Sequence, residues 1–311
     1  MNRRGFFIKF TYIILIELVN MEDLELVSVK HMPVKRVNGV TSSQLSDILS
    51  VEEPLEIRIG YGQAAQRAQK NISVTMRTPG NDVELAVGFL FTEGIISSYG
   101  DVKDVYHVGV ECSFNKKNIV QVELREDFTP YLLQADRNFY TTSSCGVCGK
   151  GSIQSIRTVS PFGDLNKPSL DLNPAILYQL AAKLKAVQSD FEATGGIHAA
   201  GLFTIHGDLI DLREDVGRHN ALDKLIGNTL INNLLPLDYH ILLLSGRASF
   251  ELIQKAAMAG VSIVAAIGAP SSLAVELAME FDITLLGFLK GDRFNIYNSS
   301  DRILIQTAYE T

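Results

Sequence analysis

The sequence has little cysteine, with three residues among 311. An odd and sparse set of cysteines excludes the disulfide framework of small secreted domains and predicts a reducing, cytoplasmic compartment. The chain also has no excess of positive charge, since its formal net charge is −7 at pH 7. This charge argues against broad, sequence-independent binding to nucleic acid, although a local basic pocket can still hold phosphates.

A complete targeting signal is missing from residues 1–20. Two arginines precede an apolar stretch, but Lys9 and Glu17 interrupt it and no small-residue cleavage site follows. The stretch is also too short and too broken to span a membrane. We therefore expect residues 1–20 to be an unstructured leader or a misassigned start, with Met21 as the natural first residue, and we expect no membrane association.

The length and apolar content are sufficient for a large core. With 311 residues, 46% of them hydrophobic, the chain is predicted to be a soluble globular protein of two domains. Residues 21–138 contain short segments in which apolar and polar residues alternate, as in strands, and one helical segment that begins at Asn81 or Asp82 and stops at Gly94. This part is predicted to be an α+β domain with a helix on a mostly antiparallel sheet.

Residues 139–311 have a different pattern. Asn173 and Pro174 are typical of the start of a helix, and two strands are predicted to turn back at residues 206–208. Another helix follows over residues 217–230, and the last third alternates continuous apolar strands with amphipathic helices. Such alternation predicts a parallel sheet covered on both faces. The predicted fold class is therefore α/β for this domain, joined to the smaller N-terminal α+β domain.

Ligands of open α/β sheets bind beyond the C-terminal ends of the parallel strands. Three loops follow such ends here, each with a glycine beside a hydroxyl or a cation, and the first two lead into helix N-termini, which favour anions. Arginine suits phosphate because its guanidinium donates two parallel hydrogen bonds, and Arg247, Lys290 and Arg293 would meet over one crevice if their strands are neighbours. We therefore expect a phosphate-bearing ligand at this edge, although turns, caps and solvated cations would explain each loop by itself. The residues concerned are Ser245, Gly246, Arg247, Gly268, Ala269, Pro270, Ser271, Ser272, Lys290, Gly291, Asp292 and Arg293.

Two histidines belong to a second cluster that contains glycine. Gly195 and Gly196 are expected to allow a close backbone approach just before His198, which begins a strand, and His219 opens a helix beside Arg218. Either histidine can move protons or hold a thiolate by hydrogen bonding. Each can equally be a structural histidine with satisfied hydrogen bonds, and the sequence leaves both interpretations open.

Cys145 and Cys148 are separated by two residues in a loop rich in glycine, serine and threonine, while Cys112 is interpreted as an ordinary residue. A structural zinc site normally uses four ligands, and the sequence has no second close pair, so a zinc clip has weak support. A thioredoxin-like site would place the pair at the start of a helix, whereas glycine follows each cysteine here. The composition predicts an exposed, mobile loop, which suits a group carrier, and Lys150 favours the reactive thiolate.

Six motifs occur along the chain in the order TTSSCGVCGKGSI, TGGIHAAGLF, REDVGRHNALDKLIG, SGRASFELIQKAAMAG, APSSLAVELA and GFLKGDRFNIY. Together they closely resemble the FdhD/NarQ family, the formate dehydrogenase accessory sulfurtransferases. The resemblance covers almost the whole chain from about Met21 onward, and residues 1–20 have no counterpart in it. It implies a second domain similar to the cytidine deaminase fold, and a homodimer.

The resemblance further implies that the protein takes sulfur from a cysteine desulfurase as a persulfide on Cys145. The sulfur would pass to the molybdenum (or tungsten) bis(molybdopterin guanine dinucleotide) cofactor before this cofactor enters the formate dehydrogenase apoenzyme. Cys148 is a candidate for assisting transfer through a disulfide with Cys145. No structural metal is expected, and His198 and His219 are candidates for contact with the ligand. The family's cofactor-binding segment falls on Phe288, Leu289, Lys290, Gly291, Asp292 and Arg293, where Asp292 adds an acidic neighbour to Arg293.

Two other functions compete with sulfur transfer. A zinc hydrolase of the deaminase type needs a metal ligand, a glutamate two residues further on and a later pair of cysteines, whereas His198 is followed by two alanines and Pro270 by two serines. A cofactor-binding chaperone without sulfur transfer needs only the phosphate loops. The cysteine pair, which a passive holder would not require, favours sulfur transfer.

Overall fold

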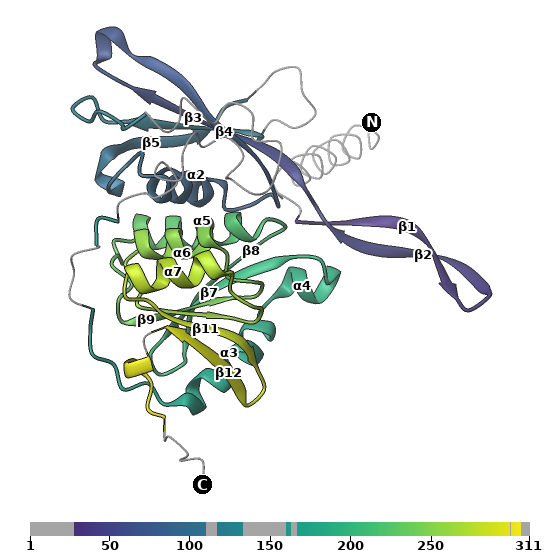
Figure 1. Cartoon of the computed structure of the whole chain (residues 1–311). Helices are drawn as coiled ribbons and strands as arrows, with labels where there is room; N and C mark the ends of the chain where they lie inside the picture. The colour runs from purple at the N-terminus through teal and green to yellow at the C-terminus, as the bar shows by residue number, and fades with distance from the viewer. Residues whose placement is uncertain (1–27, 110–116, 133–159, 163–166, 299, 306–311) are drawn as a thin grey trace, which may run out of the picture.

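The computed structural model describes residues 28–109, 117–132, 160–162, 167–298 and 300–305. The predicted leader and the predicted domain boundary after residue 138 lie outside these residues. Two sheets with helices packed between them form the body of the protein, and a hairpin projects from it to one side (Figure 1).

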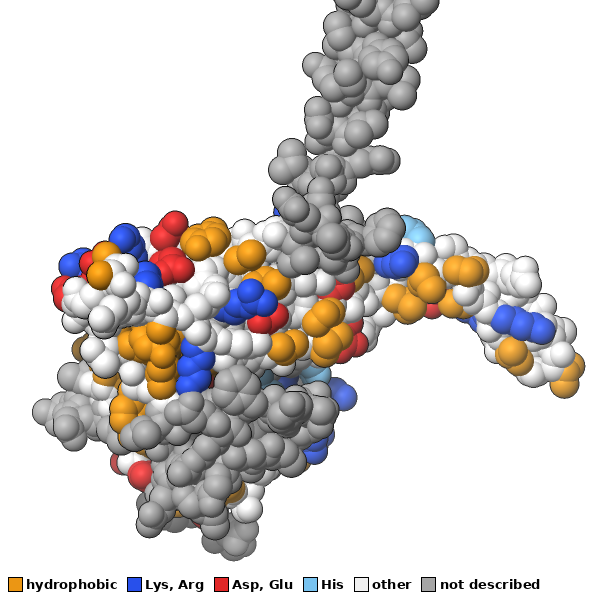
Figure 2. Space-filling model, turned by 90° about the horizontal axis from the view of Figure 1, so that it is seen from above, with side chains coloured by type: hydrophobic (Ala, Val, Ile, Leu, Met, Phe, Trp, Pro, Cys, Tyr) orange, Lys and Arg blue, Asp and Glu red, His pale blue; other side chains and the backbone are white. Residues whose placement is uncertain are grey.

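The projecting hairpin consists of β1 (Val29–Asn38) and β2 (Thr41–Ser50), which pair antiparallel over their whole length. No third strand of the described residues pairs with it. Its side chains are mostly exposed, and apolar and basic side chains lie along it in Figure 2. The hairpin is attached at its base, where Ser50 Oγ lies 2.9 Å from Thr194 Oγ1.

The first sheet has four strands in the order β4-β3-β6-β5. β3 (Glu53–Tyr61) pairs antiparallel with β4 (Ala68–Arg77) and parallel with β6 (Ile119–Leu124). β5 (Val102–His107) pairs antiparallel with β6. α2 (Asp82–Thr92) packs its buried side chains against this sheet, so the predicted helix on a mostly antiparallel sheet is confirmed.

The second sheet has six strands in the order β12-β11-β10-β9-β7-β8. Its centre is formed by β9 (His240–Leu244), β10 (Ile263–Ala266) and β11 (Thr284–Lys290), which run parallel. Their side chains are nearly all buried, which explains why the three strands read as continuous apolar runs. The parallel strands were therefore predicted correctly.

Antiparallel strands flank this parallel centre on both sides. β7 (His198–Thr204) and β8 (Leu209–Asp215) form the predicted hairpin, and β7 pairs with β9. On the other side β12 (Arg293–Asn298) pairs with β11. The sheet is therefore mixed: the parallel strands predicted from the last third form its centre, the predicted hairpin forms one margin, and β12, which was not predicted as a strand, forms the other.

Helices cover both faces of the second sheet (Figure 1). α5 (Arg218–Ile231), α6 (Phe250–Met258) and α7 (Ser272–Glu280) lie between the two sheets. α3 (Pro174–Lys185) covers the opposite face, and Asn173 caps it as predicted, accepting from the backbone N–H of Ala175 at 2.9 Å. One apolar core therefore continues from the first sheet through the middle helices to the second sheet.

Short elements account for the remaining differences from the prediction. α4 (Ser189–Thr194) was not predicted, and Gly195 ends it in the left-handed region, with φ +66°. Gly195 therefore serves as a helix cap. A Cβ on Gly195 would meet nothing within 4 Å, so no neighbour among the described residues requires glycine there, and a close backbone approach at this pair stays a prediction. The 3-10 turns span Ala64–Gln66, Tyr99–Asp101 and Ser300–Arg302.

Candidate functional site

The ends of β9, β10 and β11 meet at one edge of the second sheet. The backbone N–H of Gly268 donates to the carbonyl of Gly246 at 2.9 Å, and the N–H of Phe288 donates to the carbonyl of Gly268 at 3.1 Å. Ser271 N–H donates to Ala248 at 3.0 Å. The three loops singled out in the sequence are thus neighbours, and this edge is the candidate site.

Two helices begin at this edge, because α6 follows β9 and α7 follows β10. The Ser271 hydroxyl accepts from the backbone N–H of Ala274 at 3.3 Å and thereby caps α7. Ser272, the first residue of α7, is exposed. The helix dipoles and free N–H groups at both starts favour an anion beside the loops.

The first two loops are packed closely together. A Cβ on Gly268 would lie 2.9 Å from Cγ of Arg247, so only glycine fits beside this arginine. The Arg247 side chain is exposed to solvent, where it can reach a ligand. By contrast, Ser245 is occupied within the protein, because its hydroxyl accepts from the backbone N–H of Ala199 at 2.8 Å.

Residues 288–293 form the outer end of the site. Phe288 is 47% exposed and has a φ of +53°, at an irregularity where β11 shifts its register against β12. This backbone conformation is strained for an aromatic residue, and the shift turns the ring out toward solvent. Leu289 points the other way, into the core on the α3 side.

The segment 290–293 is a tight turn between antiparallel strands. Lys290 pairs with Arg293 across the hairpin, and Gly291 occupies the left-handed region at φ +61°. Lys290, Asp292 and Arg293 are all exposed. Lys290 ends β11 and Arg293 begins β12, whereas Arg247 lies beside the loop after β10. The three cations therefore lie on neighbouring loops at one edge of the sheet, and their meeting over one crevice stays a prediction.

The two predicted histidines lie at the opposite end of the same edge. β7 runs antiparallel to β9, so its first residue, His198, lies beside the end of β9. A Cβ on Gly246 would be 3.4 Å from Nδ1 of His198. Burial lowers the pKa of His198, and the nearby Arg218 and His219 lower it further. His198 is therefore a neutral imidazole at neutral pH.

His219 lies in the first turn of α5 and faces a residue that sequence reasoning missed. Its Nε2 is 3.9 Å from Oε2 of Glu251, which lies in the first turn of α6. The interaction with His219 lowers the pKa of Glu251 to about 2, so this carboxylate stays ionised. Nothing local in the sequence could reveal the pair, because it depends on how α5 packs beside α6.

Asp215 and Lys224 form a buried ion pair behind this end of the site, with Oδ2 and Nζ 2.8 Å apart. Asp215 also accepts from the backbone N–H groups of Thr78 and Gly217 and from Nδ2 of Asn220. Burial raises the pKa of Asp215. With four donors around it, this carboxylate holds the first sheet against α5.

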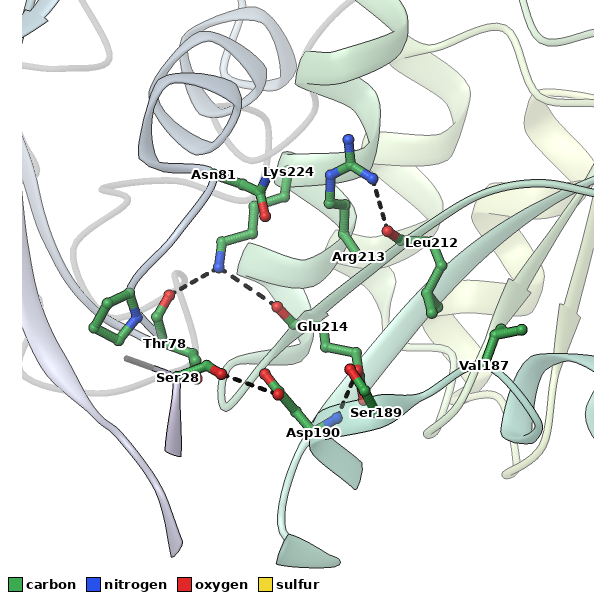
Figure 3. Close-up of a pocket in the computed structure, with 11 residues that line it drawn as sticks. Ser28, Thr78, Asn81, Val187, Ser189, Asp190, Leu212, Arg213, Glu214 and Lys224 are labelled. Atoms are coloured by element: carbon green, nitrogen blue, oxygen red, sulfur yellow. Dashed lines mark hydrogen bonds between the residues drawn. The ribbon is translucent and has the colours of Figure 1, made fainter. Parts of the chain in front are cut away.

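A separate cavity of about 380 Å³ lies between the first sheet, α4 and β8 (Figure 3). At one side Lys224 Nζ donates to the backbone carbonyl of Thr78 at 2.8 Å. At the other side the Glu214 carboxylate accepts from the N–H of Asp190 at 3.1 Å, and Asp190 accepts from Ser28 Oγ at 3.0 Å. Several polar groups of this cavity therefore bond to one another, and none of the predicted site residues lines it.

Cys145, Cys148 and Lys150 lie outside the described residues, as does Cys112. Within the part of the chain that the structure describes, no group of three metal-ligating side chains is placed to hold a metal ion. Likewise, no helix in the described ranges combines the length and the hydropathy of a membrane span.

Several known proteins are similar to this chain. The chain matches the FdhD/NarQ family over residues 50–304. The sulfur carrier protein FdhD of Mycolicibacterium paratuberculosis is 49% identical over 274 residues, covering 86% of this chain and 97% of the relative. The protein of the same name from Streptomyces coelicolor is 46% identical over 275 residues, covering 88% and 95%. That of Saccharolobus solfataricus is 37% identical over 277 residues, covering 89% and 99%.

A solved structure, described as a formate dehydrogenase accessory protein from Desulfotalea psychrophila, has a similar fold. Its TM-score is 0.68 at 20% identity, and the match covers 89% of this chain and all of the other. At this identity the likeness concerns the fold alone. The family match and the relatives extend over most of the chain and include both ends of the candidate site. The chain therefore belongs to the FdhD/NarQ family.

Proposed function

We propose that the protein is a sulfur carrier in the maturation of formate dehydrogenase. It receives sulfur from a cysteine desulfurase as a persulfide on Cys145 and delivers it to the molybdenum bis(molybdopterin guanine dinucleotide) cofactor, its substrate. The family match supports the carrier role, since the curated relatives are named sulfur carrier proteins. The observation that supports a nucleotide-bearing substrate is the edge where β9, β10 and β11 end side by side.

The loading step is a transfer of one sulfur atom between two cysteines. The Cys145 thiolate attacks the outer sulfur of the desulfurase persulfide, the S–S bond of the donor breaks, and the donor cysteine leaves as a thiolate. Cys145 then carries the S–SH group, with no net oxidation. This step needs a reactive thiolate on the carrier, for which Lys150 is the nearby cation in the sequence.

Cys148 is proposed to assist release. Its thiolate attacks the inner sulfur of the Cys145 persulfide, a Cys145–Cys148 disulfide forms, and the outer sulfur leaves as hydrosulfide. A dithiol reductant would then restore the pair. If a Cys148→Ala variant delivers sulfur as well as the native protein does, this role is wrong.

The edge fits an elongated anionic substrate. Exposed Arg247, Lys290 and Arg293 supply positive charge, the starts of α6 and α7 supply free N–H groups, and the Phe288 ring offers a flat apolar surface for a base. The distance from β7 to β11 is three strand spacings, or about 14 Å, which suits a dinucleotide better than a single phosphate. His198 and His219 would lie at the end away from the guanine.

The partners in this proposal are the desulfurase, the formate dehydrogenase apoenzyme and a second copy of the chain. The transfer would take place in the cytoplasm, where thiols stay reduced. The cytidine deaminase-like character of the second sheet and its helices stays a prediction.

Intact-mass spectrometry after incubation with a cysteine desulfurase and cysteine tests the proposal. The native protein should gain about 32 Da, the mass of one sulfur atom, and a reductant should remove it. Cys145→Ala should gain nothing, while Cys112→Ala, the matched control, should load normally. No gain on the native protein with an active desulfurase would contradict sulfur transfer and leave the cofactor-binding chaperone as the better account.

A further inference from the structure

We propose that Arg218, His219 and His198, with Glu251 as a positioning residue, form an anion subsite that holds the sulfur in transfer as its anion. The inference rests on the proposed function, and it assigns the histidine end of the edge to sulfur and the 288–293 end to the nucleotide.

Two buried nitrogen atoms at this end have no hydrogen-bond partner among the described residues, Nε of Arg218 and Nε2 of His219. A buried donor without a partner costs about 1–3 kcal/mol, so such atoms are rare outside functional sites. The Glu251 carboxylate lies 3.9 Å from Nε2 of His219, which is too far for a hydrogen bond. A small anion between Arg218 and His219 would supply the acceptor that is missing.

The charge of Arg218 is not offset by the neighbouring carboxylate. Asp215 is three residues away, but its two oxygens already accept from four donors, including the Nζ of Lys224. Glu251 pairs with His219 from the other helix. Asp215, Glu251, Arg218 and His219 are the charged or titratable groups that the structure places around His198, and Arg218 is the cation among them that keeps capacity for an anion.

The ability of His198 to accept a proton favours a sulfur ligand over a phosphate at this end of the edge. A phosphate ester carries its negative charge on oxygen, whereas a persulfide reacts as the anion that forms when its S–H proton leaves. Neutral His198 can accept that proton: the S–H bond breaks, an N–H bond forms on the imidazole, and the negative charge left on sulfur is stabilised by the Arg218 guanidinium. No electron transfer accompanies this step.

The subsite can be tested without loading the protein. The full-length Cys145→Ser variant, under anaerobic conditions, is titrated with sodium hydrosulfide and separately with inorganic phosphate, while the side-chain signals of His198 and His219 are followed by NMR. Hydrosulfide should shift both signals with saturation. Arg218→Gln should weaken this binding at least tenfold, as should His219→Gln, which provides a second route if one variant is unstable.

Matched controls are available in the same chain. Arg125, which is 57% exposed just after β6, and the exposed His206 in the β7–β8 turn can be changed to glutamine without touching the edge. For the positioning role, Glu251→Gln should weaken hydrosulfide binding and change the chemical shifts of the His219 side chain in the unbound protein, and Glu251→Asp should restore both in part. If Glu251 had a purely structural role, its replacement would change neither of these two measurements.

Two results would overturn the inference. One is hydrosulfide binding of equal strength in the Cys145→Ser protein with and without the additional change Arg218→Gln. The other is phosphate that binds here while hydrosulfide does not, which would make this the phosphate end. Failure of the proposed function would be recognised by a different result, which is the absence of a persulfide on Cys145. A persulfide on Cys145 without hydrosulfide binding would reject the subsite alone.

Discussion

Gly88 of α2 and Gly227 of α5 lie against each other's helix, and neither position has room for a side chain. A Cβ on Gly88 would overlap the backbone carbonyl of Asp223, and a Cβ on Gly227 would overlap the carbonyl of Glu84. Close contact between these helices joins the helix of the first sheet to the helix that carries Arg218 and His219.

Replacement of either glycine by alanine should destabilise the protein. The new methyl group meets backbone atoms, which cannot rotate away, so the helices must separate at a cost of about 2 kcal/mol or more. Urea unfolding of Gly88→Ala and Gly227→Ala measures this cost. Gly109→Ala is the control, since a Cβ there meets nothing within 4 Å. Equal midpoints for all three variants would show that the helices do not pack as closely as described.

The buried Lys255–Asp223 pair leads to a second prediction about the stability of the protein. Nζ of Lys255 lies 2.9 Å from both carboxylate oxygens of Asp223 and 2.9 Å from Oγ1 of Thr92. Lys255→Met leaves Asp223 buried without its cation, so the free energy of unfolding should fall by about 3–5 kcal/mol. Adding Asp223→Leu should restore part of the loss, because the uncompensated charge is then gone.

Thermal unfolding of the single and the double variant tests this pair, with Lys103→Met as the control. Lys103 is 60% exposed and pairs with Glu126 on the surface, so its loss should change stability by less than about 1 kcal/mol. A double variant less stable than Lys255→Met alone would contradict the assignment.

Glu251 should contribute stability that depends on pH. Its pKa falls from 4.5 when unfolded to about 2 when folded. A depressed carboxyl pKa means that the contribution is complete above pH 4.5 and is lost as the pH falls through this range toward 2. After allowance for solvent screening, we expect about 2 kcal/mol at pH 6.

Unfolding curves of the native protein and Glu251→Gln at several pH values measure this contribution. The gap between them should be widest near neutral pH and should narrow progressively below pH 4.5, the ordinary value for this group. A gap that is constant with pH would mean that Glu251 acts through packing and not through its charge.

The nucleotide end can be tested with guanosine diphosphate as the probe. Lys290→Ala combined with Arg293→Ala removes the exposed cations that end β11 and begin β12 and should weaken binding by tenfold or more, about 1.4 kcal/mol. The control pair Lys103→Ala and Arg125→Ala removes the same charge at the first sheet. Isothermal titration at two salt concentrations distinguishes a local contact from a general electrostatic effect. An equal loss of affinity in both double variants would contradict a local site.

Much of the fold could be predicted from local pattern. Continuous runs of apolar residues predict the buried parallel strands β9, β10 and β11, and Asn173 followed by Pro174 predicts the start of α3. The loops after the strands could then be placed at one edge, since parallel neighbours end on the same side.

β12 was missed although a signal exists. Gly291 and Asp292 form a two-residue turn of the kind that joins antiparallel strands, and the residues after it alternate in burial. The Glu251–His219 pair is different in kind, because its partners meet only through tertiary packing and no spacing along the chain encodes it.

The hairpin of β1 and β2 is a ribbon without a core of its own. Two strands that pair only with each other are marginally stable in water, so its amide hydrogens will exchange through local opening and not through unfolding of the body. Val37 and the fully exposed Val40 near its tip gain nothing from the apolar interior. The rate of exchange along the outer part of this ribbon should therefore report on what contacts it, because a bound molecule would add protection to that given by its own ladder and by the contacts at its base.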